Sequence, residues 1–254
     1  MSKIAGETAR ALQGVLFDYG ETLVEFVRPD AALAAADAQI AALLVASGHG
    51  KLTADGVRAA VLDRVERDVV EHQRRGELRE ISVVDASRVA YAEAGLELDD
   101  VLLDEVLRIE QEAWWQGASL DPAALPLLDG LRQDGLRVGL CSNAPYRVPS
   151  LHAQLAYVGL DAHLDTVTFS AEVGWRKPSP RMFAAALAAL GTDAARTVMV
   201  GDSEAHDIAG AHAAGMRAVL LRRSGGDVTS EADGVIDALG DAPGAFRGIG
   251  LYWG

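Results

Sequence analysis

Five polar side chains stand at or just beyond the ends of apolar, strand-like runs in the sequence. They are Asp18, Ser142, Lys177, Asp202 and Asp207. Carboxylate oxygens are the ligands that Mg²⁺ prefers, an ammonium group offsets the charge of a phosphoryl group, and a hydroxyl donates a hydrogen bond to it. Residues of these types, brought together, would form a site for a divalent cation and a phosphoryl group.

The elements that must position these side chains alternate between strand and helix. Residues 15–20 form a short apolar run that ends in Gly, as a buried parallel strand does. Such alternation predicts right-handed crossovers and a parallel sheet, whose ligands bind beyond the carboxyl ends of the strands. The later strands are predicted at 137–143, 166–172, 197–203 and 217–223, with an edge strand near Val235, and the helices at 122–134, 146–158, 180–190 and 205–214.

About a hundred residues of helical periodicity separate the first strand from the rest. Apolar side chains recur there at helical spacing, as at Leu102 and Val106. We therefore expect an α/β protein with a doubly wound, Rossmann-like parallel sheet. Its core domain is predicted to comprise residues 1–27 and 119–254, and an all-helical cap domain is inserted at 28–118.

Lysine usage singles out Lys177. Of the 23 basic residues only three are Lys, at Lys3, Lys51 and Lys177, so this residue does not reflect a general use of lysine. Arg and Lys are not interchangeable where a compact point charge is needed. Ser179 as N-cap and Pro180 as the first helical residue place Lys177 in the loop above the sheet.

The charge balance excludes several classes of partner. The 254 residues contain 23 Lys and Arg against 37 Asp and Glu, a formal charge of −14, and such a surface repels nucleic acid and anionic lipid. The single cysteine, Cys141, excludes an internal disulfide, and no uncharged stretch is long enough to span a bilayer. We expect a cytoplasmic monomer or homodimer that acts on a small molecule, with no nucleic-acid or membrane partner.

Four segments together resemble a known family. FDYGETL, LCSNA, EVGWRKPSPRMF and VMVGDSEAHDIAGAHAAGM stand in the order and rough spacing of the four motifs of the haloacid dehalogenase-like hydrolase superfamily, across residues 14–223. The helical insertion after the first motif is similar to the small cap of phosphoglycolate phosphatase-like and dehalogenase-like members. The resemblance implies a Mg²⁺-dependent phosphatase that acts on a small phosphorylated metabolite.

The resemblance also implies a role for each motif residue. Asp18 would be the nucleophile that forms an aspartyl-phosphate, a covalent step open to carboxylates. The residues expected to bind the phosphoryl group are Ser142, Asn143 and Lys177. Those expected to hold Mg²⁺ are Asp18, Gly20 through its carbonyl, and Asp202, with Asp207 supporting this metal site from behind.

The first motif departs from the family at two positions. Gly20 stands where family phosphatases carry a second Asp as general acid and base, and Glu21 stands where they carry Gly. General acid–base catalysis contributes about 10²- to 10⁴-fold in rate, so its loss should greatly slow the hydrolysis of substrates with poor leaving groups. Glu21 is the first replacement we consider. Two other possibilities are that a residue of the cap supplies the proton and that the leaving group of the substrate needs none.

The departure leaves other functions open on the same scaffold. Dehalogenases also lack the second Asp, but they replace the Gly-Asp pair that is here Gly201 and Asp202. A phosphonatase-like hydrolase also has a small residue at the second position, and it would need Lys51 as a Schiff-base lysine in the cap. A catalytically weak binding protein is the third alternative.

Overall fold

The centre of the molecule is a six-stranded parallel sheet. The computed structural model describes residues 11–50, 52–223 and 230–253. Its main sheet has the order β5-β4-β1-β6-β7-β8, so the chain builds outward from β1 in one direction and then in the other. The strands are β1 (Gly14–Phe17), β4 (Arg137–Ser142), β5 (Thr166–Phe169), β6 (Thr197–Gly201), β7 (Arg217–Leu221) and β8 (Gly234–Ile236).

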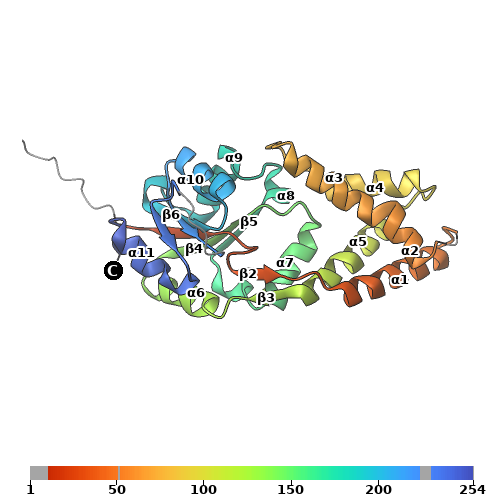
Figure 1. Cartoon of the computed structure of the whole chain (residues 1–254), viewed down its shortest axis with the longest axis horizontal. Helices are drawn as coiled ribbons and strands as arrows, with labels where there is room; N and C mark the ends of the chain where they lie inside the picture. The colour runs from red at the N-terminus through yellow and green to blue at the C-terminus, as the bar shows by residue number, and fades with distance from the viewer. Residues whose placement is uncertain (1–10, 51, 224–229, 254) are drawn as a thin grey trace, which may run out of the picture.

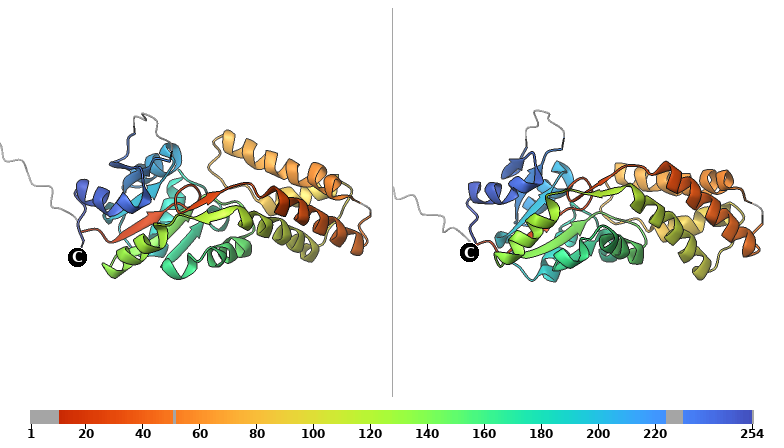
Figure 2. Two further views of the ribbon diagram at one scale, coloured as in Figure 1. Left: turned by 60° about the horizontal axis from the view of Figure 1, so that its bottom comes forward. Right: turned by 90° about the horizontal axis from the view of Figure 1, so that it is seen from below.

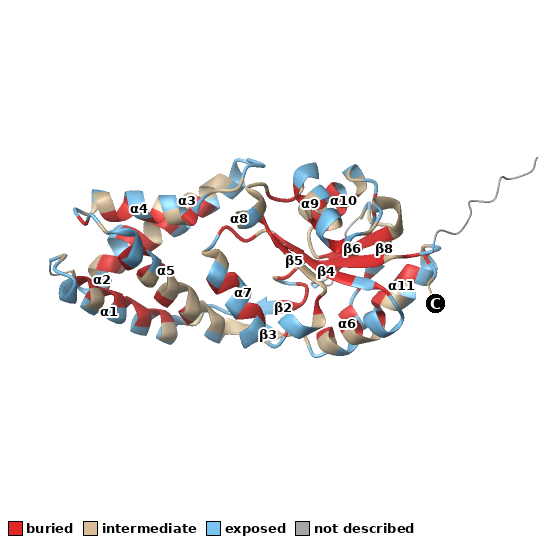
Figure 3. Cartoon of the chain, turned by 180° about the vertical axis from the view of Figure 1, so that it is seen from behind, coloured by how far each residue is buried: buried red, intermediate tan, exposed pale blue. Residues whose placement is uncertain are grey.

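Two layers of helices cover the sheet (Figure 1). Side chains of successive strand residues face opposite sides, so Val15 and Phe17 pack with one layer and Leu16 packs with the other. The first layer is α6 (Ala124–Gln133), α7 (Val148–Tyr157) and α11 (Ala242–Gly248); the second is α9 (Pro180–Leu190) and α10 (Ala209–Ala213). Figure 3 shows the strands buried between them. The doubly wound α/β prediction is confirmed.

Several elements differ from the sequence prediction in their bounds or in their type of helix. The strand predicted at 166–172 stops at Phe169, where the one-turn helix α8 (Ser170–Val173) begins. The helix predicted at 205–214 begins as a π-helical turn, Glu204–Ile208, before α10. Short 3₁₀ turns lie at Trp115–Gly117, Asp161–His163, Ala194–Arg196 and Leu239–Asp241.

The helical insertion buries an apolar cluster of its own. It contains α1 (Asp30–Ala46), α2 (Ala54–Val57), the π turn Arg58–Leu62, α3 (Asp63–Arg74), α4 (Val83–Glu93) and α5 (Asp100–Trp114). A two-stranded ribbon of β2 (Val24–Phe26) and β3 (Ala118–Leu120) carries both connections to the sheet, and Figure 2 shows the helices extending away from it. On this basis we propose the division into a core of 1–27 and 119–254 and a cap of 28–118.

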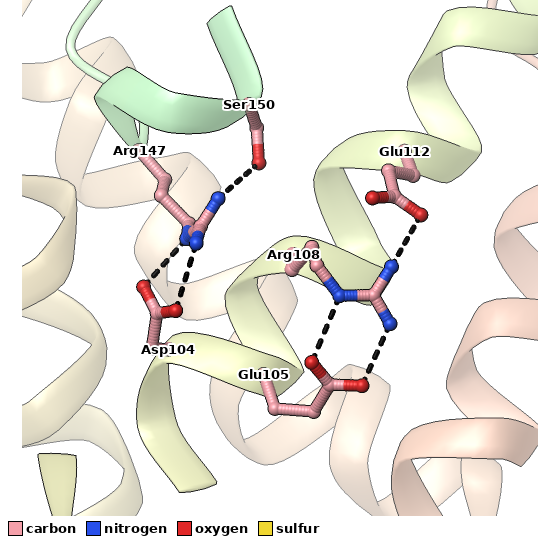
Figure 4. A network of polar contacts seen from close by, with 6 residues as sticks. All are labelled: Asp104, Glu105, Arg108, Glu112, Arg147 and Ser150. Carbon is pink, nitrogen blue, oxygen red and sulfur yellow. Dashed lines mark hydrogen bonds and ion pairs between the residues drawn. The ribbon is translucent and has the colours of Figure 1, made fainter. Parts of the chain in front are cut away.

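Helix α5 of the cap is ion-paired to the start of α7 in the core (Figure 4). The Arg147 guanidinium donates to both carboxylate oxygens of Asp104, at 2.5 and 2.8 Å, and the Arg147 N–H donates to Gln111 Oε1. These contacts tether the cap to the loop that follows β4. No helix of the described ranges has the length and apolar character needed to cross a lipid bilayer.

Candidate active site

The sheet topology brings three of the predicted residues to one edge. Strands β1, β4 and β6 are neighbours and run parallel. Ser142 is the last residue of β4, and Asp18 and Asp202 directly follow β1 and β6. Because the chain winds in opposite directions on the two sides of β1, this edge is the position where open α/β sheets bind their ligands.

Lys177 reaches this edge from the loop between α8 and α9. Helix α9 starts as predicted: the Ser179 hydroxyl accepts a hydrogen bond from the Arg181 N–H, and Pro180 is the first helical residue. The chain therefore leaves the loop at a defined angle. Lys177 is 1% exposed although it belongs to a connecting segment.

Two carboxylates hold the Lys177 ammonium group. Its Nζ lies 2.9 Å from Asp18 Oδ1 and 2.6 Å from Asp207 Oδ1. Burial alone lowers the pKa of Lys177, but the charges of Asp18 and Asp207 raise it well above its ordinary value. Lys177 is therefore a permanent cation beside Asp18, which is the property that binding a phosphoryl group requires.

Asp207 occupies the centre of this arrangement and is fully buried. Its Oδ1 accepts from Lys177, and its Oδ2 accepts from the Ser203 N–H at 3.0 Å. Gly201 makes room for it, because a Cβ there would lie 2.3 Å from Asp207 Cγ. Burial raises the pKa of Asp207 to about 7, and Lys177 opposes that rise. The contacts make Asp207 the group that fixes Lys177 to the loop after β6.

The acidic groups at this edge suit a divalent cation. Oxygens of Asp18, Asp202 and Asp207 all lie within 4.8 Å of one another. Burial and the neighbouring Asp18 carboxylate raise the pKa of Asp202, which shows that two like charges approach each other in a partly desolvated place. A hard cation would offset this repulsion, and carboxylate oxygens are the donors that Mg²⁺ takes. The donor set therefore fits Mg²⁺.

Asn143 contacts Lys177 rather than standing free at the edge. Its Oδ1 accepts from the Lys177 N–H at 2.6 Å, and its Nδ2 donates to the Lys177 carbonyl at 3.1 Å. The side chain thus clamps the main chain of the lysine loop to the end of β4. A direct role in substrate binding stays a prediction, while this positioning role was not expected from the sequence.

The turn after Asp18 carries an unusual backbone conformation. Glu21 has φ 55°, in the left-handed region that costs a residue other than Gly about 1–2 kcal/mol. Arg223 braces the turn by donating to the carbonyls of Glu21 and Thr22 at 2.8 and 2.7 Å. The Glu21 carboxylate is exposed and adds, after burial and Asp18, to the rise in the pKa of Asp202. The charge of Glu21 therefore acts on the Asp202 carboxylate.

Arg223 forms a second contact that sequence reasoning missed, because about 200 positions separate it from the turn it braces. Nothing in the local sequence around residue 223 signals that partner. Lys51, which the phosphonatase alternative requires, lies outside the described residues. No observation among the described residues supports a cap lysine at the active site.

Comparison with known proteins supports the same chemistry. The family model described as haloacid dehalogenase-like hydrolase matches residues 12–215. A ribulose-1,5-bisphosphate 5-phosphatase of Halopiger xanaduensis is 36% identical over 48% of this chain and 52% of its own length. Phosphatase MT3486 of Mycobacterium tuberculosis is 35% identical over 61% of this chain and 67% of its own. A phosphoserine phosphatase of Thermus thermophilus is 41% identical over 41% of this chain and 41% of its own length, and a phosphoglycolate phosphatase of Rhodospirillum rubrum is 40% identical over 41% and 42%.

A solved structure shares the whole fold. A crystal structure of an HAD phosphatase from Thermococcus onnurineus superposes with a TM-score of 0.63 over 93% of this chain and 99% of that one, at 24% identity. That likeness concerns the fold. The chain spans about half the length of the Halopiger relative that it matches, so similarity in sequence is concentrated in part of each protein.

Proposed function

Since this chain belongs to the haloacid dehalogenase-like hydrolase family, we propose that it is a Mg²⁺-dependent phosphatase that hydrolyses a small phosphorylated metabolite through Asp18. One observation carries the proposal: a buried lysine ammonium lies 2.9 Å from Asp18, at the sheet edge where Asp202 also stands. Relatives named as phosphatases of ribulose-1,5-bisphosphate, phosphoserine and phosphoglycolate support the substrate class.

Asp18 is positioned as a nucleophile with one oxygen available. Its Oδ1 accepts from the Tyr19 N–H at 2.7 Å and from Lys177. We infer that Oδ2 attacks phosphorus. A bond forms between Oδ2 and phosphorus while the bond from phosphorus to the leaving oxygen breaks, and that oxygen takes up a proton. Water then attacks the phosphorus of the aspartyl-phosphate, which releases inorganic phosphate and restores the carboxylate.

The remaining edge residues would hold the phosphoryl group. An ammonium group has three donors, and two of those on Lys177 face Asp18 and Asp207, so one remains for a phosphoryl oxygen. The hydroxyl of Ser142 would donate to another. Asp18, Asp202 and the carbonyl of Gly20 would hold Mg²⁺, which supplies positive charge for the phosphoryl oxygens.

The test is phosphate release from para-nitrophenyl phosphate, acetyl phosphate and sugar phosphates, with Mg²⁺ and with EDTA. We expect metal-dependent turnover that Asp18→Asn abolishes while circular dichroism shows that the variant stays folded. Turnover that survives in Asp18→Asn would contradict the proposed nucleophile. Absence of turnover with every phosphate, in a folded protein loaded with Mg²⁺, would favour the alternative of a binding protein.

We propose that Glu21 supplies the proton that Gly20 cannot. A strained left-handed backbone at a residue where Gly would be free of strain is typical of a side chain retained for function. The expected consequence of Glu21→Gln is a fall of about 10²-fold in turnover of sugar phosphates, whose leaving groups need a proton. Acetyl phosphate, whose leaving group does not, should lose little. Equal turnover of both substrates in the variant and the parent would reject this role.

Gly20→Asp offers a complementary test. A Cβ at residue 20 would meet only the Phe26 ring, at 3.6 and 3.8 Å, which is ordinary van der Waals contact. An Asp there should therefore fit and restore the missing acid. We expect it to raise sugar-phosphate turnover and to rescue the Glu21→Gln variant. Failure to rescue, with the fold intact, would show that proton transfer does not limit the reaction.

A further inference from the structure

The cap touches the core at the residue next to Lys177. The segment between α3 and α4 lies antiparallel to the segment after α8, with Arg79 opposite Trp175. The Arg176 N–H donates to the Leu78 carbonyl at 2.9 Å, and the Glu80 N–H donates to the Gly174 carbonyl at 3.1 Å. Figures 1 and 3 both show the end of α3 beside α8. A cap segment is thus held by main-chain hydrogen bonds within one residue of the active-site lysine.

The two faces of this contact differ. On one face, the guanidinium groups of Arg79 and Arg181 lie 5.7 and 4.2 Å from the Trp175 ring. Because side chains alternate along paired extended segments, Arg176 and Glu80 lie on the other face. Arg176 lowers the pKa of His206, second to the effect of burial. The charge of Arg176 therefore acts on the segment that follows Asp202.

Arg176 is a buried charge without a counter-charge. It is 5% exposed, its Nη1 has no hydrogen-bond partner, and no carboxylate among the described residues pairs with it. The other buried charged residues of the described chain are all paired: Lys177 with Asp18 and Asp207, and Asp37 with Arg58. A guanidinium cannot lose its proton at ordinary pH, so it cannot avoid the cost of burial by becoming neutral.

Glu80 of the cap segment and Glu204 of the segment after Asp202 each have a buried carboxylate oxygen without a hydrogen-bond partner, Oε2 and Oε1 respectively. No ion pair joins either of them to Arg176 among the described residues. Among residues 11–50, 52–223 and 230–253, no group thus takes up the charge of Arg176. A guanidinium binds carboxylates and phosphates through two parallel hydrogen bonds, which defines the chemistry of a ligand that would pair with it.

We propose that Arg176 binds a second anionic group of the substrate, a carboxylate or a second phosphoryl group carried on the leaving-group side. This inference rests on the proposed function, because the first phosphoryl group is bound by the adjacent Lys177. Lys177 and Arg176 would then bind the two anionic groups of one small molecule. The cap segment 78–80 would close over the second end, since it is hydrogen-bonded to the main chain of Arg176 itself.

Matched substrate pairs test the proposal. 3-Phosphoglycerate and glycerol 3-phosphate differ by a carboxylate against a hydroxymethyl group, and fructose 1,6-bisphosphate and fructose 6-phosphate differ by the second phosphoryl group. We expect the parent protein to prefer one acidic member, and Arg176→Gln to lower kcat/KM for it by about 10- to 100-fold, the range expected for a bidentate charged pair. The member without a second anionic group is called the neutral member below. Its kcat/KM should change by less than about twofold, because it makes no such pair with Arg176.

Arg79→Gln is the matched control. It removes an arginine from the opposite face of the same cap–core contact, so it should leave the preference for the acidic member unchanged. Arg176→Lys, which keeps the charge without the planar fork, should recover part of the lost kcat/KM and serves if Arg176→Gln fails to fold. An equal loss for acidic and neutral members in Arg176→Gln would overturn the proposal and assign Arg176 to cap attachment.

A binding measurement separates this proposal from the proposed function. Asp18→Asn should leave the ligand intact, so calorimetry can compare 3-phosphoglycerate, fructose 1,6-bisphosphate and their neutral partners with and without Arg176→Gln. If no substrate is turned over but an acidic ligand binds more weakly without Arg176, only the phosphatase proposal fails. If neither acidic ligand binds more tightly than its neutral partner, the proposal for Arg176 fails whatever the turnover.

Discussion

Two ion pairs of equal length, one in the core and one in the cap, differ in what their charges can still do. Lys177 Nζ lies 2.6 Å from Asp207, and Arg58 Nη2 lies 2.6 Å from Asp37. In the cap, Arg58 Nε also donates to Asp37 at 2.8 Å, so the guanidinium and the carboxylate satisfy each other. In the core, Lys177 is shared with Asp18 as well.

This difference shows when a buried charged side chain can still bind a ligand. A bidentate pair is closed and serves as structure, whereas an ammonium shared between two acids keeps a donor for a ligand. The core pair also stands at the carboxyl edge of the sheet, where open α/β sheets generally bind their ligands. The cap pair stands within a helical unit with its own apolar cluster. Variants that break each pair should therefore have different consequences.

The largest effect is expected from Asp207→Asn. The variant removes the carboxylate that fixes Lys177 to the Ser203 N–H. Removing one partner of a buried ion pair costs about 3–5 kcal/mol. Because Asp18 still pairs with Lys177, we expect the free energy of unfolding to fall by about 3 kcal/mol, the lower end of that range. Turnover should fall by about 10²- to 10³-fold, through misplacement of Lys177. Urea unfolding and steady-state kinetics measure the two effects. Unchanged turnover would show that Lys177 needs no such support.

Asp37→Asn is the corresponding variant in the cap. It leaves the partly buried guanidinium of Arg58 without its carboxylate, and we expect a loss of about 2 kcal/mol in the free energy of unfolding. Turnover per folded molecule should stay within about twofold of the parent, because the pair lies away from the sheet edge. A large fall in kcat with little loss of stability would contradict the structural assignment of this pair.

Asn143→Ala tests the clamp on the lysine loop. Two hydrogen bonds to the main chain of Lys177 are lost, each contributing about 0.5–1.5 kcal/mol. We expect kcat to fall about tenfold, since the ammonium is less well positioned. Asn143→Asp keeps the oxygen that accepts from the Lys177 N–H and should recover part of the rate. A rise in KM alone, with kcat unchanged, would favour direct substrate binding by Asn143 instead.

The smallest effect concerns a cap carboxyl beside the Arg58–Asp37 pair. Burial raises the pKa of Glu110 to about 7; Arg58 opposes the rise and Asp37 adds to it. A carboxyl whose pKa is raised by folding favours the folded state at low pH, and that contribution is lost as the pH rises from about 4.5 to about 7. Glu110→Gln removes this pH dependence, so the variant should be more stable than the parent at pH 8 by comparison with pH 4.5. Because Glu110 keeps some exposure, we expect the difference in the free energy of unfolding between variant and parent to change by only about 1–2 kcal/mol between the two pH values.

Glu105→Gln is the control for this prediction. Glu105 lies on the same helix, and its hydrogen bonds to Arg108 lower its pKa (Figure 4). Its variant should show no gain at pH 8. Urea unfolding at pH 4.5 and pH 8 measures both variants. A gain at pH 8 that is the same in Glu105→Gln and Glu110→Gln would reject burial of Glu110 as the cause.

Much of the core was predictable because its signals are local. Helix α9 was predicted at 180–190 and occupies those residues, since Ser179 and Pro180 start it and Gly191, at φ 71°, ends it. The strand ends that carry Asp18, Ser142 and Asp202 were predicted for the same reason. The π-helical turn at 204–208 was not predicted, because the apolar pattern of that segment indicates a helix but not its type; Asp207 within the turn packs against Gly201.

The sequence by itself determined the types of the candidate site residues, their order along the chain and the helical insertion, because apolar periodicity and capping residues act over a few positions. Only the tertiary structure decided that Asn143 clamps Lys177, that Arg223 braces the strained turn at Glu21, and that Arg176 is buried with no counter-charge from the described part of the chain. These contacts join residues tens to hundreds of positions apart. Their energies depend on burial and geometry, which exist only once the chain has folded.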